Sequence, residues 1–325
     1  MAACGSSSPA PAEEPIEFVE PQPYPRPEYR WLSETGLFDD ASAGSMSAAA
    51  RPFQPRFQLW SDGAQKRRWI ALPEATQIET SDGNRWQLPI GTRLWKEFSL
   101  DGVKLETRLI ERYGRAKEDY WMGAFVWNAD GTDAEFQSDG QSDVHGTTHD
   151  APPQKQCLSC HNGEPGRAIG FSSLQLATEA DDPSAWTLQQ LKEEQRLTSP
   201  PPPAAAPSME EDVATAALGY LHANCGHCHN PRGTAWPDTQ MILRLDAEEL
   251  GSGFPAENTA LYASVVSQEV QYFRDAQVTY RVTPGDPASS ALIVRMNVRG
   301  PREQMPPLAT ELVDPDGLTR VSAWI

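Results

Sequence analysis

The run Cys225-Gly226-His227-Cys228-His229 decides how the rest of the chain is interpreted, and Cys157-Leu158-Ser159-Cys160-His161 repeats its pattern earlier. Both runs read Cys-x-x-Cys-His. In this pattern two thiols bond the vinyl groups at one edge of a porphyrin, and the adjacent imidazole ligates the iron. The sequence therefore predicts two covalently bound haem c groups, with His161 and His229 as iron ligands.

Zinc and redox thiols are the alternatives for cysteines arranged in two pairs. Zinc ribbons also use two Cys-x-x-Cys pairs, but residues 161–224 separate the pairs here, which is far beyond the usual spacing. Each second cysteine is also followed directly by a histidine. Haem attachment is the favoured interpretation, and a zinc site, paired disulfides or a redox dithiol remain the alternatives.

The region 208–325 has the organisation of a complete haem domain. Residues 208–211 form a capping-box pattern, and the apolar residues after them recur at helical spacing up to the second haem motif. Met305-Pro306-Pro307 places a thioether in a proline-stiffened loop, which suits a weak, soft iron ligand. Asp314-Pro315 then begins a closing helix. We predict a leading helix, a haem motif, a methionine loop and a closing helix.

The end of the chain carries a more specific pattern. Met305-Pro306-Pro307 is followed by Val321-Ser322-Ala323-Trp324-Ile325, and this combination resembles the end of many class I cytochromes c. The resemblance implies that His229 is the proximal ligand and Met305 the distal ligand of the second haem. A methionine that only fills the core is the alternative.

Length and charge limit the remaining functions. A chain of 325 residues is expected to form about two domains. The formal charge of −18, from 27 basic and 45 acidic residues without a basic run, argues against nucleic acid and against adsorption on anionic lipid. This acidity would steer a basic redox partner protein, and it is also an ordinary feature of soluble surfaces.

The fifth cysteine, Cys4, stands apart from the haem motifs. Small residues precede it, and a stretch rich in Ser, Pro and Glu follows it, so residues 1–28 resemble a bacterial lipobox with a disordered tether. An N-terminus with an incidental thiol is the alternative. No stretch is long and apolar enough to span a bilayer. Covalent haem and a lipid tether at Cys4 both predict a location in the periplasm or at the outer membrane.

Residues 29–150 have a different character. Asp-Gly turn signals separate runs of aromatic and branched residues at 93–98, 103–110 and 120–127. The pattern predicts a mainly antiparallel β domain, in the form of a meander within a small sandwich or barrel. Six tryptophans are expected in its core, with a carbohydrate-binding or electron-tunnelling surface as the alternative: Trp60, Trp69, Trp86, Trp95, Trp121 and Trp127.

Two charged runs within this β region are unusual, namely Lys66-Arg67-Arg68 and Glu106-Thr107-Arg108. Strand alternation allows them to face solvent, which is the default expectation. Alternatively, an arginine or lysine among them reaches a haem propionate across the domain boundary.

Further motifs extend along nearly the whole chain beyond residue 28. They are Leu32-Ser33-Glu34-Thr35-Gly36-Leu37-Phe38, Leu59-Trp60-Ser61-Asp62-Gly63-Ala64, Glu106-Thr107-Arg108-Leu109, the two haem motifs and Pro284-Gly285-Asp286-Pro287. Together they resemble a little-characterised family of bacterial dihaem c-type cytochromes, which are often lipoproteins. The resemblance implies a redox function and supplies no substrate.

The first haem has no methionine loop of its own. Its motif lies in segment 151–199, which ends at a stiff proline-rich linker, 200–207, and no Met-Pro-Pro run lies between the two haem motifs. The sixth ligand must come from elsewhere or be absent. Candidates, each of which could equally be an ordinary loop or core residue, are His145, His149, His222, Met122 and Met296. His227 is not expected to serve the iron of its own motif.

The sequence thus predicts an α+β multidomain protein. A β-rich domain, 29–150, is followed by the first haem segment and by a class I-like cytochrome c domain, 208–325. If the first iron is six-coordinate, both haems relay single electrons between extracytoplasmic redox proteins, and no catalytic residue is assigned. If it is five-coordinate, a peroxidase-like dihaem enzyme is the alternative, and a β-domain binding module is the third class. We favour electron transfer.

Overall fold

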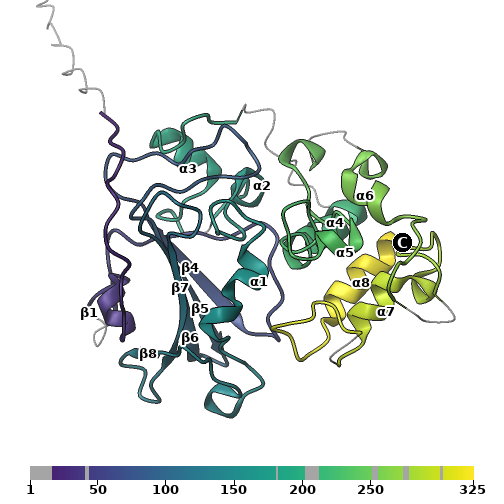
Figure 1. The fold of residues 1–325 in the computed structure, drawn as a ribbon, viewed down its shortest axis with the longest axis horizontal. Helices are drawn as coiled ribbons and strands as arrows, with labels where there is room; N and C mark the ends of the chain where they lie inside the picture. Colours follow the sequence, from purple (N-terminus) through teal and green to yellow (C-terminus); the bar gives the residue numbers. More distant parts are fainter. Residues whose placement is uncertain are drawn as a thin grey trace, which may run out of the picture.

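The computed structural model describes residues 17–40, 44–180, 182–201, 212–250, 255–273, 278–300 and 303–325. Cys4, the capping-box pattern at 208–211 and residues 202–207 of the linker lie outside these ranges. The described chain has mixed α and β content, with an antiparallel sheet in its first half and short helices in its second half (Figure 1).

Six strands form one antiparallel sheet in sequence order. They are β3 (Arg51–Pro52), β4 (Gln65–Ala71), β5 (Arg93–Leu100), β6 (Val103–Arg112), β7 (Tyr120–Trp127) and β8 (Ala134–Phe136), while β1 (Phe38–Asp40) and β2 (Ser45–Met46) form a separate pair. The expected antiparallel meander is confirmed. Because β3 and β8 end the order without pairing to each other, the sheet is open, and a closed barrel is wrong.

The β5–β6 hairpin sets the register of the sheet. Asp101 and Gly102 form its two-residue turn with φ values of 50° and 81°. Two left-handed positions are what a twisted hairpin turn requires, and Asp-Gly adopts them readily. A bulge near Phe98 then shifts the pairing so that Lys96 lies opposite Arg108.

The two faces of the sheet pack against different parts of the chain. One face packs against the N-terminal segment, including the 3₁₀ turn η1 (Leu32–Thr35). The other face, through Ile70 and Leu94, packs against α2 (Ser173–Leu176) and α3 (Leu188–Glu193). Five of the six tryptophans are buried, which confirms the core interpretation for Trp69, Trp86, Trp95, Trp121 and Trp127, whereas Trp60 is half-buried.

Short helical segments connect or follow the sheet. Before the C-terminal part these are η2 (Val144–Gly146), η3 (Gln154–Gln156) and α1 (Cys157–His161). The C-terminal part contains α4 (Val213–Asn224), α5 (Trp236–Thr239), η5 (Ala247–Leu250), η6 (Ala256–Asn258), α6 (Ala260–Val265), η7 (Pro287–Ser289), α7 (Ala291–Asn297) and α8 (Pro315–Trp324).

The predicted leading and closing helices are α4 and α8, and they pack against each other. Asp212 caps α4 by accepting a hydrogen bond from the Thr215 amide at 2.7 Å. Asp314 caps α8 in the same way, from the Gly317 amide at 2.9 Å, and the predicted start of this helix is confirmed. Gly317 lies directly against the Tyr220 ring, where any larger residue would push the two helices apart.

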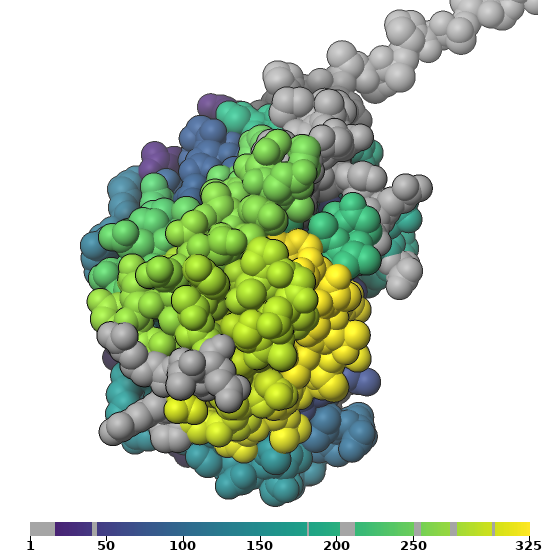
Figure 2. Space-filling view, turned by 90° about the vertical axis from the view of Figure 1, so that its right-hand side faces the viewer, coloured from purple at the N-terminus to yellow at the C-terminus, as the bar shows by residue number. Residues whose placement is uncertain are grey.

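Segment 53–62 joins the sheet to the helical part. Phe57 belongs to the apolar core of the C-terminal helices and lies directly against Gly219 of α4. The Asn224 side chain, at the end of α4, accepts a hydrogen bond from the Trp60 amide at 2.6 Å and donates one to the Gln58 carbonyl at 3.3 Å. The helical part therefore docks through both apolar and polar contacts, and Figure 2 shows its residues covering that face of the molecule.

Candidate functional site

A cavity of about 290 Å³ lies between the sheet and the helical part. Its wall is largely apolar and includes Phe53, Phe57 and Leu94. Every predicted attachment or ligand residue of the two haem motifs also lines it, together with the loop methionine: Cys157, Cys160, His161, Cys225, Cys228, His229 and Met305. Residues far apart in the sequence thus meet around one space.

The first motif is held on the sheet by η3. The Gln154 side-chain amide donates to the Met122 carbonyl of β7 at 2.7 Å, and α1 follows directly, between the sheet and the C-terminal helices (Figure 1). His161 Nδ1 lies 2.5 Å from the Arg167 carbonyl. A carbonyl only accepts, so Nδ1 carries the proton and Nε2 keeps its lone pair. Desolvation lowers the pKa of His161 to about 4, so the ring is neutral at pH 7.

The second motif follows α4 and orients its histidine in the same manner. His229 Nδ1 lies 3.3 Å from the Thr239 hydroxyl, which already donates its proton to the Ala235 carbonyl at 2.9 Å. The hydroxyl therefore accepts from Nδ1–H, and Nε2 of His229 is again the free nitrogen. Desolvation lowers the pKa of His229 to about 4. Both histidines therefore present a neutral ring whose Nε2 atom keeps its lone pair.

The methionine loop is held in place by backbone contacts. The Met305 amide donates to the Arg295 carbonyl at 2.9 Å, which ties the loop to α7. The Gln304 side chain donates to the Pro306 carbonyl at 3.1 Å and to the Thr310 carbonyl at 3.2 Å, bracing the loop from within. Met305 lies in the cavity wall that also contains His229.

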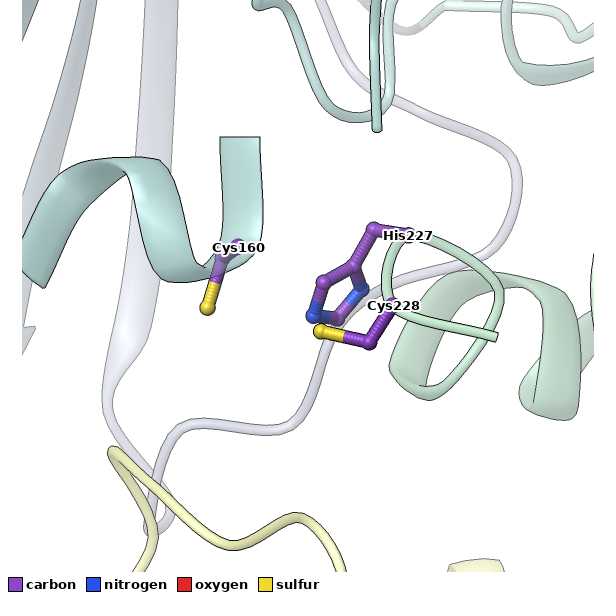
Figure 3. A group of neighbouring side chains, drawn as sticks. All are labelled: Cys160, His227 and Cys228. Carbon is purple, nitrogen blue, oxygen red and sulfur yellow. The ribbon is translucent and has the colours of Figure 1, made fainter. Parts of the chain in front are cut away.

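The two attachment segments contact each other directly. The Thr234 hydroxyl donates to the Ser159 carbonyl at 3.0 Å. One sulfur or nitrogen atom from each of Cys160, His227 and Cys228 lies within 4.8 Å of the others, and Figure 3 shows these side chains facing a shared space. A hydrogen bond from the Cys160 thiol, opposed by desolvation, lowers the pKa of Cys228 to about 4. The sequence did not predict this meeting of the two motifs.

This three-residue cluster is also the feature that a zinc site would use. Structural zinc is held by four ligands, and the cluster offers three. A zinc ion there would leave Cys157, Cys225 and Met305 without a role in the wall of the cavity. The apolar lining of the cavity fits an organic group better than a single ion.

The histidine candidates for the first haem's sixth ligand do not line the cavity. His145 is exposed. His149 Nε2 lies 2.8 Å from Glu106 Oε1. His222 Nδ1 accepts from the Leu245 amide at 3.0 Å, and desolvation lowers the pKa of this histidine to about 3. The sulfur candidates Met122 and Met296 both lie in the wall.

The charged runs of the β region reach the cavity from the sheet. Arg68 pairs with Lys96, and Lys96 pairs with Arg108, so the three cations form a row across β4, β5 and β6. All three residues line the cavity, and we call Arg68, Lys96 and Arg108 together the cation row. Sequence reasoning named Arg68 and Arg108 but missed Lys96. The Asp-Gly turn was the available signal, although the bulge in β6 prevents a simple count of the register.

Within the described part of the chain, Glu106 is the carboxylate that binds Arg108 of the cation row. Its Oε1 atom accepts from Arg108 at 2.5 Å and from His149 at 2.8 Å, and the side chain is fully buried. Burial alone would raise the pKa of Glu106, but Arg108 and His149 outweigh it and the pKa is lowered. Glu106 is therefore ionised at neutral pH and stabilises the fold in that form.

Replacing Glu106 by glutamine is expected to cost about 2–3 kcal/mol at pH 7, because charge-assisted hydrogen bonds are lost. A lowered folded-state pKa means that the contribution is complete above the ordinary value of 4.5 and is lost as the pH falls through the folded value. Denaturant unfolding of both proteins between pH 3 and 7 measures this. The two stabilities should converge on acidification, and a pH-independent difference would contradict the assignment.

Comparison with protein-family models, with curated proteins and with solved structures returns no match. Among the described helices, none has both the length and the apolar composition needed to cross a membrane.

Proposed function

We propose that the protein is a dihaem c-type cytochrome that relays single electrons between extracytoplasmic redox partners. One observation carries the proposal: two Cys-x-x-Cys-His motifs from distant parts of the chain line a single apolar cavity, and Met305 lines it with them. In this proposal the helices α4–α8 belong to a class I-like cytochrome domain.

The residues of the cavity wall fit two covalent haems. Thiols, neutral imidazoles with free Nε2 atoms and a thioether are the groups that attach haem and ligate its iron. Arg68 and Arg108 are suited to haem propionates. His227 Nδ1 is buried without a partner among the described residues, as expected where a further group completes a site.

Bound haem supplies reversible one-electron oxidation and reduction of iron. The chain sets the conditions for this chemistry. The Arg167 carbonyl and the Thr239 hydroxyl orient the two imidazoles, and the Met305 thioether favours the reduced metal over the oxidised one. Apolar residues such as Leu94 exclude water from the cavity, and the Thr234–Ser159 hydrogen bond fixes the two attachment segments relative to each other.

Partners and location follow from charge and from Cys4. The formal charge of −18 suits a partner that presents a basic patch, and the attraction would weaken as salt rises. Lipidation of Cys4 would tether the protein in the periplasm or at the outer membrane, where c-type haem is found. A peroxidase-like function would need an acid–base group at an open iron, and His149 is engaged by Glu106 outside the cavity wall.

Haem content tests the proposal directly. The protein is expressed with a c-type cytochrome maturation system, and the pyridine haemochrome assay should give two haems per chain. The variants Cys157→Ser/Cys160→Ser and Cys225→Ser/Cys228→Ser should each retain one. Metal analysis of the same samples should find iron in the same ratio, and zinc without covalent haem would overturn the proposal in favour of a zinc site.

A further inference from the structure

We propose that Lys96 supplies the sixth ligand to the iron of the first haem, through its amine nitrogen. The inference rests on the proposed function, because it requires haem at the motif of Cys157, Cys160 and His161. It assigns an amine ligand from the β-sheet, whereas the sequence suggested histidines and methionines.

The position of Lys96 suits this role. It lies on β5, a central strand with β4 and β6 on either side, so its backbone is fixed by hydrogen bonds to both neighbours. Its side chain lines the same cavity as His161. A rigid strand is a better platform for a metal ligand than a loop, because the amine's position is set by the fold.

Lys96 differs from the other cationic side chains nearby in its hydrogen bonds. Lys66 donates to the Leu59 carbonyl at 2.7 Å, Arg108 to Glu106 and Arg68 to the Gln58 side chain. No hydrogen bond from the Lys96 amine to any part of the described chain is present, and its ring contact is with Phe98, at 4.7 Å from the centroid. Lys96 is half-buried and its amine is not among the buried atoms without a partner, so the amine opens onto the cavity, where a bound group could take it as a ligand.

Of the three residues in the cation row, Lys96 is the one whose side chain can act as an iron ligand. Arginine stays protonated and has no lone pair to offer, so Arg68 and Arg108 cannot ligate iron. Lysine can lose its proton, and a metal promotes that loss on binding. Desolvation, followed by the charges of Arg68, Arg108 and Lys66, places the pKa of Lys96 well below its ordinary range, with Glu106 opposing. The surroundings therefore ease the loss of the proton, and the neutral amine is the form that ligates.

Other candidate residues in the wall also have ligand atoms, and each is less suited. Met296 is buried in the apolar core of the C-terminal helices. Met122 is a buried methionine on β7, and its thioether is satisfied by apolar packing alone. His227 lies within the cluster of Cys160 and Cys228, at the thiols that bond the porphyrin edge. The Lys96 amine, by contrast, is not part of the thiol cluster, and its ring contact is with Phe98.

Replacing Lys96 by arginine and by histidine distinguishes a role as an iron ligand from a role as a positive charge. Lys96→Arg keeps the positive charge but cannot ligate, so one of the two haems should become high-spin and bind carbon monoxide when reduced. Lys96→His can ligate, so both haems should stay low-spin, with a shifted near-infrared band and electron paramagnetic resonance signal. Lys66→Arg, on the neighbouring strand, is the matched control and should leave all spectra unchanged.

The outcomes are distinguishable from failure of the proposed function. Pyridine haemochrome should still report two haems in every variant, and absence of haem in the unmodified protein would remove both proposals together. If Lys96→Arg remains fully low-spin with two haems, Lys96 is a charge partner for propionates and the ligand assignment is wrong. If Met122→Leu or His227→Asn opens the first iron while Lys96→Arg does not, the ligand is that residue instead.

Discussion

Replacing Met305 by leucine is expected to open one of the two haem irons to carbon monoxide and to lower its reduction potential. Leucine keeps the volume of the side chain, so the loop held by Gln304 and Arg295 should stay in place. The thioether is lost as a ligand, and with it the preference for reduced iron. The fall should be on the order of 0.1 V, within the roughly 0.8 V that axial ligation spans.

Spectroelectrochemical titration of the holoprotein measures both potentials, and carbon monoxide difference spectra count the open iron. Met241→Leu is the matched control, because Met241 also lines the cavity but lies outside the methionine loop. Its potentials should not change. If both variants behave alike, or if the Met241 variant alone opens an iron, Met305 is not the distal ligand of the second haem.

Replacing Arg244 by methionine is expected to destabilise the holoprotein by about 3–5 kcal/mol, the largest loss of stability from any single change considered. Arg244 is buried and forms an ion pair with Glu164, which follows the first haem motif, and it donates to the Asn84 carbonyl at 2.5 Å. Without the guanidinium, the buried Glu164 carboxylate has lost its partner. The pair also joins the helical part to the first attachment segment.

Chemical denaturation at pH 7 measures the loss. Burial raises the pKa of Glu164 and Arg244 opposes this, so in the variant the carboxyl takes up a proton more readily. The destabilisation should therefore be smaller at pH 5 than at pH 8. Glu164→Gln in the same chain should recover much of the loss, which a double-mutant cycle reports. Lys117→Met, at an exposed ion pair with Glu118, is the control and should cost less than about 1 kcal/mol.

Local chemistry made part of this architecture predictable. The Asp101-Gly102 turn, the start of α8 at Asp314 and Pro315, and the antiparallel strands follow from residues close in sequence, whose conformational preferences act without distant partners. The two Cys-x-x-Cys-His runs and Met305 could also be singled out, because haem attachment and sulfur ligation demand particular residues at fixed spacing, and they line one cavity. Their role in binding haem stays a prediction.

The features that could not be predicted depend on contacts between residues that are far apart in the sequence. The position of Lys96 opposite Arg108 depends on a bulge in β6, which shifts the register by one residue. The ion pair of Glu164 with Arg244 and the meeting of Cys160 with Cys228 depend on how the helical part docks. His149 looked like a free loop histidine beside the first motif, yet it folds back onto Glu106 on the sheet.

The closeness of Cys160 and Cys228 constrains the order of biosynthesis. Their side chains approach only when the helical part has docked, and docking also closes the cavity over all four thiols. In an oxidising compartment, a chain that folded first would bring one thiol of each motif into reach of the other, and a disulfide between them would consume both. If the chain carries the two haems proposed above, the porphyrins must therefore be attached to the extended chain, before its two halves come together.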